Sequence, residues 1–335
     1  MTYAEDPITA PPIRWGILGP GGIAHTFAHA ALRHTRAELV AVGSRDRVRA
    51  EAFASRYEIP FPHESYQALV EDSHIDVVYV ATPHSEHLEH ALLAIEAGKH
   101  VLVEKSFTRN AAEAQQLVDA ARAAGVFCME AMWTRFLPHV VALRSVLDRG
   151  EIGEIVGLIA DHGQPFASRP PEHRIHNPVL AGGALLDLGV YPVSFAHDLL
   201  GVPDRINAVG SLTPTGVDGQ LSIALGFGPD VQASLHTTSL AKTATTAVVA
   251  GKEGMIEVAG DFYRPSSFTV TRDDGSWWSF SREVDGGFQY QIAEVARRIA
   301  EGATESPRIT LDDSLAVMRT MDEIRRQAEV VYPGE

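Results

Sequence analysis

A glycine-rich turn near the start of the chain has the residue types and spacing that bind phosphate. The turn follows the apolar run 14–18 and leads into a helical pattern, and its glycines and Ala24 give G-x-G-x-x-A between a strand and a helix. The first glycine permits a tight turn, the second lets the backbone approach a pyrophosphate, and Ala24 permits close helix–strand packing. Exposed N–H groups and the helix dipole then favour a diphosphate. We therefore predict a dinucleotide site that includes Gly19, Gly21, Gly22 and Ile23.

The end of the second apolar strand indicates which dinucleotide binds. An enzyme that uses NAD tends to place an acid there to hold the ribose hydroxyls. In this chain the position is Ser44, followed by Arg45, with Arg49 close behind. A serine can donate to a 2′-phosphate, and an arginine can pair with it or stack on adenine. Asp46 could bind a ribose instead, but we interpret it as the cap of the next helix. The pattern predicts NADP, with NAD as the alternative.

Regularly spaced histidines raise the question of a metal site. His84, His87 and His90 are three residues apart and follow the turn Thr82–Pro83 at the end of the third apolar strand. Ligands bind at the carboxyl ends of strands in this architecture, so the turn, His84 and His87 are candidates for contact with the cofactor. No nearby set of cysteines or carboxylates completes a metal site. We expect no bound metal.

A lysine stands at the end of the next strand. Lys105 follows Glu104 directly after the apolar run 101–103. A lysine at the carboxyl tip of such a strand is placed to face the cofactor. The alternative is an exposed ion pair with Glu104.

An aspartate and a tyrosine form the second candidate pair. Asp187 and Tyr191 are four residues apart, so on a helix they share one face. The alternative is a packed tyrosine and a capping aspartate. Gly182 and Gly183, just before them, indicate close approach of a ligand or of another backbone.

The elements that position these residues alternate between strand and helix through the first half. Short strands that are apolar on both faces are expected where helices cover both sides of a parallel sheet. The alternation predicts an α/β Rossmann domain with a doubly wound parallel sheet over residues 13–132. The expected strands are 14–18, 39–43, 76–80, 100–103 and 126–129, and the expected helices are 23–33, 46–57, 86–97 and 111–124.

The second half of the chain has a different pattern of residues. Glycine, threonine and serine separate alternating runs at 221–227, 231–237, 247–250 and 255–258, and helical patterns follow at 290–301 and 312–329. This predicts an α+β C-terminal domain over 133–335 with a large open, mainly antiparallel sheet, whose last helix can pack back on the first domain. One face of that sheet is available to pair with another subunit, so we expect a homodimer or homotetramer.

Composition bounds the class of protein. A chain of 335 residues with 45% hydrophobic and 21% charged residues is typical of a globular protein of two domains. Its 43 acidic and 28 basic residues give a net charge of −15, which disfavours nucleic acid and anionic membranes as partners. The single cysteine, Cys128, lies in an apolar run and predicts a buried, inert thiol. We expect neither a signal peptide in residues 1–12 nor a membrane span, and hence a cytoplasmic location.

Several motifs occur in the order of a known family. The strand and turn from Arg14, the Thr82–Pro83–His84 turn, Glu104–Lys105 and Gly-Gly-x-Leu-x-Asp-x-Gly-x-Tyr at 182–191 together resemble the Gfo/Idh/MocA oxidoreductase family. Residues 130–136 are similar to the branch that contains dimeric dihydrodiol dehydrogenase and NADP-dependent D-xylose dehydrogenase. The resemblance extends from Arg14 to Tyr332.

The resemblance implies roles for three residues. Lys105 takes the place of the family's lysine, which orients the substrate and polarises the reacting oxygen. Asp187 and Tyr191 fall on the family's Asp-x-x-x-His, with tyrosine as the acid/base of this branch. The Lys105 amine and the Tyr191 phenol are expected to converge over the nicotinamide from separate domains. There the adjacent ammonium would favour the phenolate and bring the tyrosine toward a useful working pH. Ser106 replaces the family's proline, so the turn that presents Lys105 is expected to be less rigid.

Aromatic and basic residues complete the expected pocket. Trp133 and Phe136 would wall it, with core packing as the alternative, and Phe166 and Phe288 are further aromatic candidates. Arg174 would bind substrate hydroxyls, with a solvated loop as the alternative. Such a pocket suits a sugar, a polyol or a cyclic trans-dihydrodiol. Further expected cofactor contacts are Trp133 and Arg135, and the expected substrate contacts are Lys105, Trp133, Phe166, Arg174, Asp187, Tyr191 and Phe288.

Three functions compete. The sequence favours an NADP-dependent oxidoreductase, because a non-catalytic redox sensor of the same fold would need neither Lys105 nor Tyr191. The sensor is the alternative. A metal-dependent hydratase or lyase using the histidines is the third hypothesis.

Overall fold

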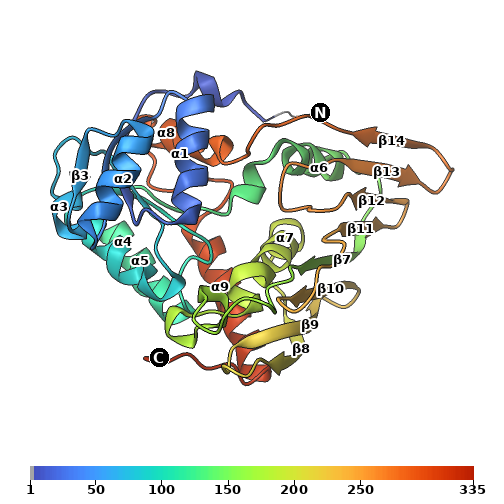
Figure 1. The fold of residues 1–335 in the computed structure, drawn as a ribbon. Coiled ribbons are helices and arrows are strands. Elements are labelled where there is room, and N and C mark those ends of the chain that lie inside the picture. Colours follow the sequence, from blue (N-terminus) through green and yellow to red (C-terminus); the bar gives the residue numbers. More distant parts are fainter. Residues whose placement is uncertain (1–3) are drawn as a thin grey trace. The chain divides into compact units, whose positions relative to one another are not determined.

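The computed structural model describes residues 4–335. Residues 1–3, part of the segment for which we expect no signal peptide, lie outside the described residues. Contacts divide the chain into two compact units (Figure 1). The cofactor unit comprises residues 5–133 and 286–315, and the sheet unit comprises 134–285 and 316–335. The expected domain limits, 13–132 and 133–335, stay predictions, and the segment 286–315 belongs to the cofactor unit.

The cofactor unit contains a parallel six-stranded sheet in the order β3-β2-β1-β4-β5-β6. This is the strand order of dinucleotide-binding sheets, in which the order reverses between β1 and β4. The predicted doubly wound α/β domain is confirmed. The strands are β1 Arg14–Leu18, β2 Glu38–Gly43, β3 Phe61–His63, β4 Val77–Val80, β5 His100–Val103 and β6 Cys128–Glu130.

Helices follow the strands of this unit in sequence. Helix α1 packs beside α8, and α4 packs against both α3 and α5. Trp15, Phe27 and Tyr79 are fully buried: Phe27 of α1 stacks on Tyr79 of β4 and meets the Trp15 ring of β1 edge to face. The helices are α1 Gly22–His34, α2 Arg47–Tyr57, α3 Tyr66–Val70, α4 His87–Glu96, α5 Ala111–Ala124 and α8 Gln289–Ala300.

The sheet unit contains an eight-stranded sheet in the order β14-β13-β12-β11-β7-β10-β9-β8. All pairs are antiparallel except β7 with β10, so the predicted open, mainly antiparallel sheet is confirmed. The strands are β7 Ile155–Gly163, β8 Arg205–Leu212, β9 Asp218–Phe227, β10 Val231–Thr238, β11 Ala247–Gly251, β12 Gly254–Val258, β13 Phe268–Arg272 and β14 Trp277–Phe280.

One face of this sheet is covered from within the unit. Helix α7 (Val190–Leu200) packs on β7 and β10, and burial alternates along β9 and β10, so the opposite face is exposed. The other α-helices of the described residues are α6 (Pro138–Asp148) and α9 (Leu311–Gln327). The segment Pro178–Leu200 is long and apolar enough to cross a membrane, but 89% of its most apolar window is buried inside the protein, as in a core helix.

Candidate cofactor and catalytic sites

The glycine turn has the backbone geometry that its sequence predicts. Gly19 has φ +95°, and a Cβ there would lie 2.9 Å from Thr82 Cγ2 and 3.3 Å from the Ala81 carbonyl oxygen. Only glycine accepts that conformation and that approach without strain. Gly21 precedes α1 and supplies no side-chain cap, so the first turn of α1 presents backbone N–H groups for an anion. The turn therefore fits a pyrophosphate.

Ser44 and Arg45 stand where β2 ends. Ser44 is buried, and its hydroxyl accepts from the Asp46 amide at 3.1 Å. Asp46 accepts from the amides of Val48 and Arg49, which confirms that it caps α2. The Arg45 side chain is 70% exposed, so its guanidinium is accessible to a phosphate. This arrangement fits the predicted 2′-phosphate contact.

Two residues that sequence reasoning missed surround Arg45. Glu86 lies 3.3 Å from its guanidinium, and the Tyr66 ring lies 5.9 Å from the guanidinium carbon. His90 contacts the edge of the Tyr66 ring and lies 3.0 Å from the Thr82 hydroxyl. No short motif marks these residues, because they come from α3, from the turn after β4 and from α4.

His87 connects two turns at the carboxyl edge of the sheet. It is fully buried, with Nδ1 2.9 Å from the Ser106 carbonyl oxygen and Nε2 2.9 Å from that of Thr82. Burial lowers the pKa of His87 to about 4, and that of His90 to about 4. Neutral imidazoles donate from one nitrogen at a time.

His84 is also buried, with its ring 5.6 Å from that of His87. Residues 4–335 hold no cluster of metal-ligating side chains.

Glu104 and Lys105 follow β5 as predicted, but they are not an exposed pair. Glu104 is buried, and its carboxylate accepts from the Tyr79 phenol and, at 3.3 Å, from the Lys105 amide. Burial raises the pKa of Glu104 to about 7, whereas the phenol and the Lys105 charge lower it. The Lys105 side chain is half-buried. The alternative of an exposed ion pair is therefore wrong for Glu104.

Trp133 and Phe288 form an aromatic pair within the cofactor unit. Both are buried, with ring centroids 4.7 Å apart. Arg135 belongs to the sheet unit, where it is buried and donates to Ser194, with Asp198 at 3.6 Å. These contacts favour a structural role for Arg135 over the predicted contact with the cofactor, which stays a prediction.

Asp187 and Tyr191 lie at the start of a long helical segment in the sheet unit. Residues Leu185–Gly189 form a π-helical turn that continues into α7. Such turns are uncommon and concentrate at functional sites. Asp187 is buried and accepts from both terminal nitrogens of Arg174, at 2.7 and 3.1 Å. The structure thus joins two of the predicted substrate contacts into one bidentate pair.

Tyr191 lies in a cluster that the sequence does not reveal. Its ring is 4.7 Å from that of Tyr263 and 5.3 Å from that of the fully buried His162. The Gln164 amide donates to the Tyr263 hydroxyl at 3.2 Å and lies 3.0 Å from His162 Nε2. Phe166 is half-buried and stacks with His173. The cluster fixes the orientation of the Tyr191 ring.

Comparisons with known proteins agree with this geometry. Residues 13–132 match the model of an oxidoreductase family with an NAD-binding Rossmann fold (Gfo/Idh/MocA), and residues 140–257 match that family's C-terminal domain. The chain is 35% identical to the pig trans-1,2-dihydrobenzene-1,2-diol dehydrogenase, over 96% of this chain and 99% of the relative. It is 36% identical to the NADP-dependent D-xylose 1-dehydrogenase of Hypocrea jecorina, over 96% and 93%. A 3-ketoreductase from Actinomadura kijaniata, solved with NADP and TDP-benzene, superposes with a TM-score of 0.84 at 29% identity, over 95% and 98%.

Proposed function

Because this chain belongs to the Gfo/Idh/MocA oxidoreductase family, we propose that it is an NADP-dependent oxidoreductase acting on a carbinol or carbonyl carbon of a sugar, polyol or cyclic trans-dihydrodiol. One observation carries the cofactor assignment. The glycine turn, with Gly19 at φ +95°, lies at the reversal of strand order, and the adjacent strand β2 is followed by Ser44 and Arg45 rather than by an acid.

The catalytic roles are assigned to residues of this chain. When bound, the nicotinamide accepts or supplies the hydride. Tyr191 takes the proton of the substrate hydroxyl during oxidation and returns it during reduction, as general base and acid. The Lys105 ammonium binds the reacting oxygen and stabilises its negative charge. Asp187, held by Arg174, binds a substrate hydroxyl beside Tyr191. Trp133, Phe166 and Phe288 are the proposed apolar contacts of the ring.

The test is oxidation or reduction of the cofactor with a panel of aldoses, inososes and cyclic diols, followed at the nicotinamide absorbance. Tyr191→Phe should lower kcat by about 100-fold or more, because general acid–base catalysis contributes on that scale. Its NADP affinity should stay unchanged. The matched control is Tyr57→Phe, which removes a phenolic hydroxyl from helix α2 and should retain the wild-type kcat.

Two outcomes would overturn the proposal. Equal kcat in wild type and Tyr191→Phe removes the acid/base assignment. Tight NADP binding without turnover on any member of the panel favours the redox sensor.

Assembly and location belong to the same proposal. The exposed face of the eight-stranded sheet carries apolar side chains that include Ile159, Val209 and Trp277, at 61%, 77% and 69% exposure. An apolar face of that kind supports a homodimer or homotetramer formed through this sheet. The buried thiol of Cys128, in a chain with one cysteine, supports a cytoplasmic location. A sugar substrate would assign the enzyme to carbohydrate metabolism.

A further inference from the structure

The turn formed by Gly182 and Gly183 leads directly into the segment with Asp187 and Tyr191, and two distant parts of the sheet unit bind it. Gly183 has φ +117°, and its N–H donates to the Ile175 carbonyl at 2.8 Å. A Cβ on Gly182 would lie 2.4 Å from the Arg174 carbonyl oxygen. The turn is therefore packed against the backbone that precedes it, and neither glycine leaves room for a side chain.

The first distant contact comes from the start of β9. Asp218 is fully buried, and its Oδ2 accepts from the Leu185 amide at 2.6 Å. This carboxylate acts as an N-cap supplied from another strand, because Leu185 begins the π-helical turn. A Cβ on Gly183 would lie only 2.1 Å from the Oδ1 of Asp218, so the carboxylate occupies the space that a side chain there would need. Burial raises the pKa of Asp218 to about 6, and its contacts with backbone amides oppose that shift.

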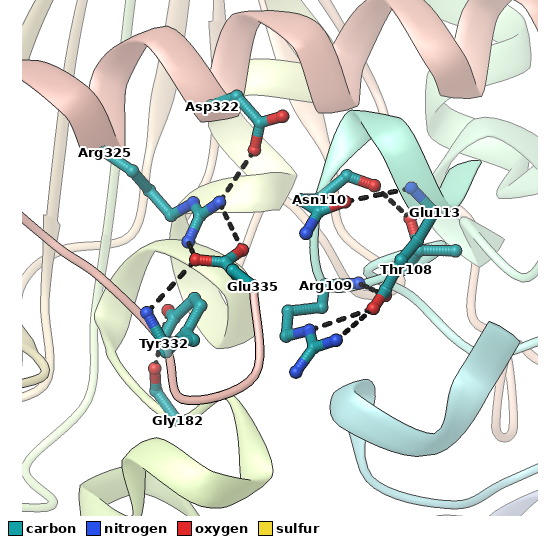
Figure 2. A network of polar contacts seen from close by, with 9 residues as sticks. All are labelled: Thr108, Arg109, Asn110, Glu113, Gly182, Asp322, Arg325, Tyr332 and Glu335. Carbon is teal, nitrogen blue, oxygen red and sulfur yellow. Dashed lines mark hydrogen bonds and ion pairs between the residues drawn. The ribbon is translucent and has the colours of Figure 1, made fainter. Parts of the chain in front are cut away.

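The second distant contact comes from the C-terminal tail, residues 328–335. The buried phenol of Tyr332 donates to the Gly182 carbonyl at 2.7 Å. Figure 2 shows how the tail is fixed: Arg325 of α9 pairs with Asp322 at 3.0 Å and with Glu335 at 2.8 Å. The guanidinium carbon of Arg325 also lies 4.8 Å from the centre of the Tyr332 ring.

We propose that Tyr332 and Asp218 are positioning residues for catalysis, which hold the Gly182–Gly183 turn and thereby set the placement of Asp187 and Tyr191. The inference rests on the catalytic roles proposed above. Each contact touches backbone within the few residues that precede Asp187, so loss of either contact changes the start of the helical segment rather than the reacting groups themselves. A displacement of about 1 Å at reacting groups can lower a rate by up to about 100-fold.

The test compares Tyr332→Phe with a control at the end of helix α9, Gln327, which directly precedes the tail. Tyr332→Phe removes only the hydroxyl that donates to Gly182. Gln327→Met removes two hydrogen bonds to β8, to the Ile206 carbonyl and from the Ala208 amide, and leaves the turn intact. We expect kcat per NADPH-binding site to fall at least about fivefold in Tyr332→Phe, with unchanged KM for NADP, and to stay at the wild-type value in Gln327→Met.

Amide hydrogen exchange supplies a readout that does not depend on turnover. Loss of one buried hydrogen bond of about 1 kcal/mol should speed exchange of the amides of residues 183–191 about fivefold in Tyr332→Phe, but not in Gln327→Met. Asp218→Ala should do the same, and Asp218→Asn, which keeps a carbonyl acceptor for Leu185, should restore most of the protection and of kcat.

The outcomes separate the two proposals. Unchanged exchange at 183–191 in Tyr332→Phe, or equal loss of kcat in Gln327→Met, overturns the positioning role. An inactive wild type overturns the proposed function alone, because the exchange measurement still decides whether the tail and Asp218 hold the turn.

Discussion

Glu104→Gln should stabilise the protein near neutral pH. Glu104 has a pKa of about 7 in the folded chain, against 4.5 for the free side chain, because burial penalises the carboxylate. The folded state therefore takes up a proton between these two values, and the contribution of Glu104 to stability falls as pH rises from about 4.5 to 7 and is constant above. A difference of 2.5 pKa units corresponds to roughly 3 kcal/mol.

Glutamine mimics the protonated acid at this site. Its NH₂ can donate to the Tyr79 oxygen while its carbonyl accepts from the Lys105 amide, which is the arrangement that a protonated Glu104 would adopt. The variant should match wild type at about pH 4.5 and be more stable by up to roughly 3 kcal/mol above pH 7. The difference between the two proteins isolates Glu104 from the buried histidines, whose lowered pKa values act in the opposite direction.

Urea unfolding at pH 5, 6, 7 and 8 measures this difference. Tyr79→Phe is the companion variant, because it removes a hydrogen-bond donor that lowers the pKa of Glu104. When Glu104→Gln is made in the Tyr79→Phe protein, the stability difference that it causes should become constant at a higher pH than in the wild-type protein. A difference that does not vary between pH 5 and 8 would refute the reasoning, as would a Glu104→Gln protein that is less stable than wild type at pH 8.

Two further predictions concern the cofactor. Gly19→Ala should cost about 1–3 kcal/mol of stability and weaken NADP binding, because φ +95° and the 2.9 Å approach of Thr82 both oppose a side chain. The control is Gly98→Ala, at φ +72° with open space around it, which should leave NADP affinity unchanged. Calorimetric titration that gives Gly19→Ala the same NADP affinity as wild type would contradict this prediction. Arg45→Ala should weaken NADP about tenfold and NAD little, whereas Glu86→Gln should tighten NADP about threefold by removing a competing carboxylate 3.3 Å from Arg45. Parallel changes for NADP and NAD would disprove the 2′-phosphate assignment.

The sequence predicts those parts of the fold in which local pattern and packing agree. The strands at 14–18, 39–43 and 100–103 are apolar and enter a sheet buried on both sides, and Asp46 caps α2 as its residue type indicates. Strand β3 was missed because it has three residues and two of them, Phe61 and Pro62, are exposed.

The candidate site was predictable where one segment contains it and not where distant segments meet. The glycine turn and the residues after β2 follow from local spacing. The π-helical turn before Tyr191 has no local signature, since it begins beside a carboxylate 33 positions away at Asp218. The ring contacts of Tyr191 depend on His162 of strand β7 and on Tyr263 of the loop between β12 and β13, which are distant in the sequence. Contacts of this kind are determined by tertiary packing and not by the local periodicity of the sequence.

The return of residues 286–315 to the cofactor unit has a consequence for synthesis of the protein. Helix α8 is buried along Gln289–Ala296 and packs beside α1, the Cys128 amide donates to the Thr304 carbonyl, and Ser314 donates to the buried Glu130. A ribosome that has released the first 133 residues has therefore delivered a nucleotide-binding sheet without one of its covering helices. That surface stays uncovered until almost the whole polypeptide has emerged, so gene fragments that end near Trp133 should yield aggregation-prone products.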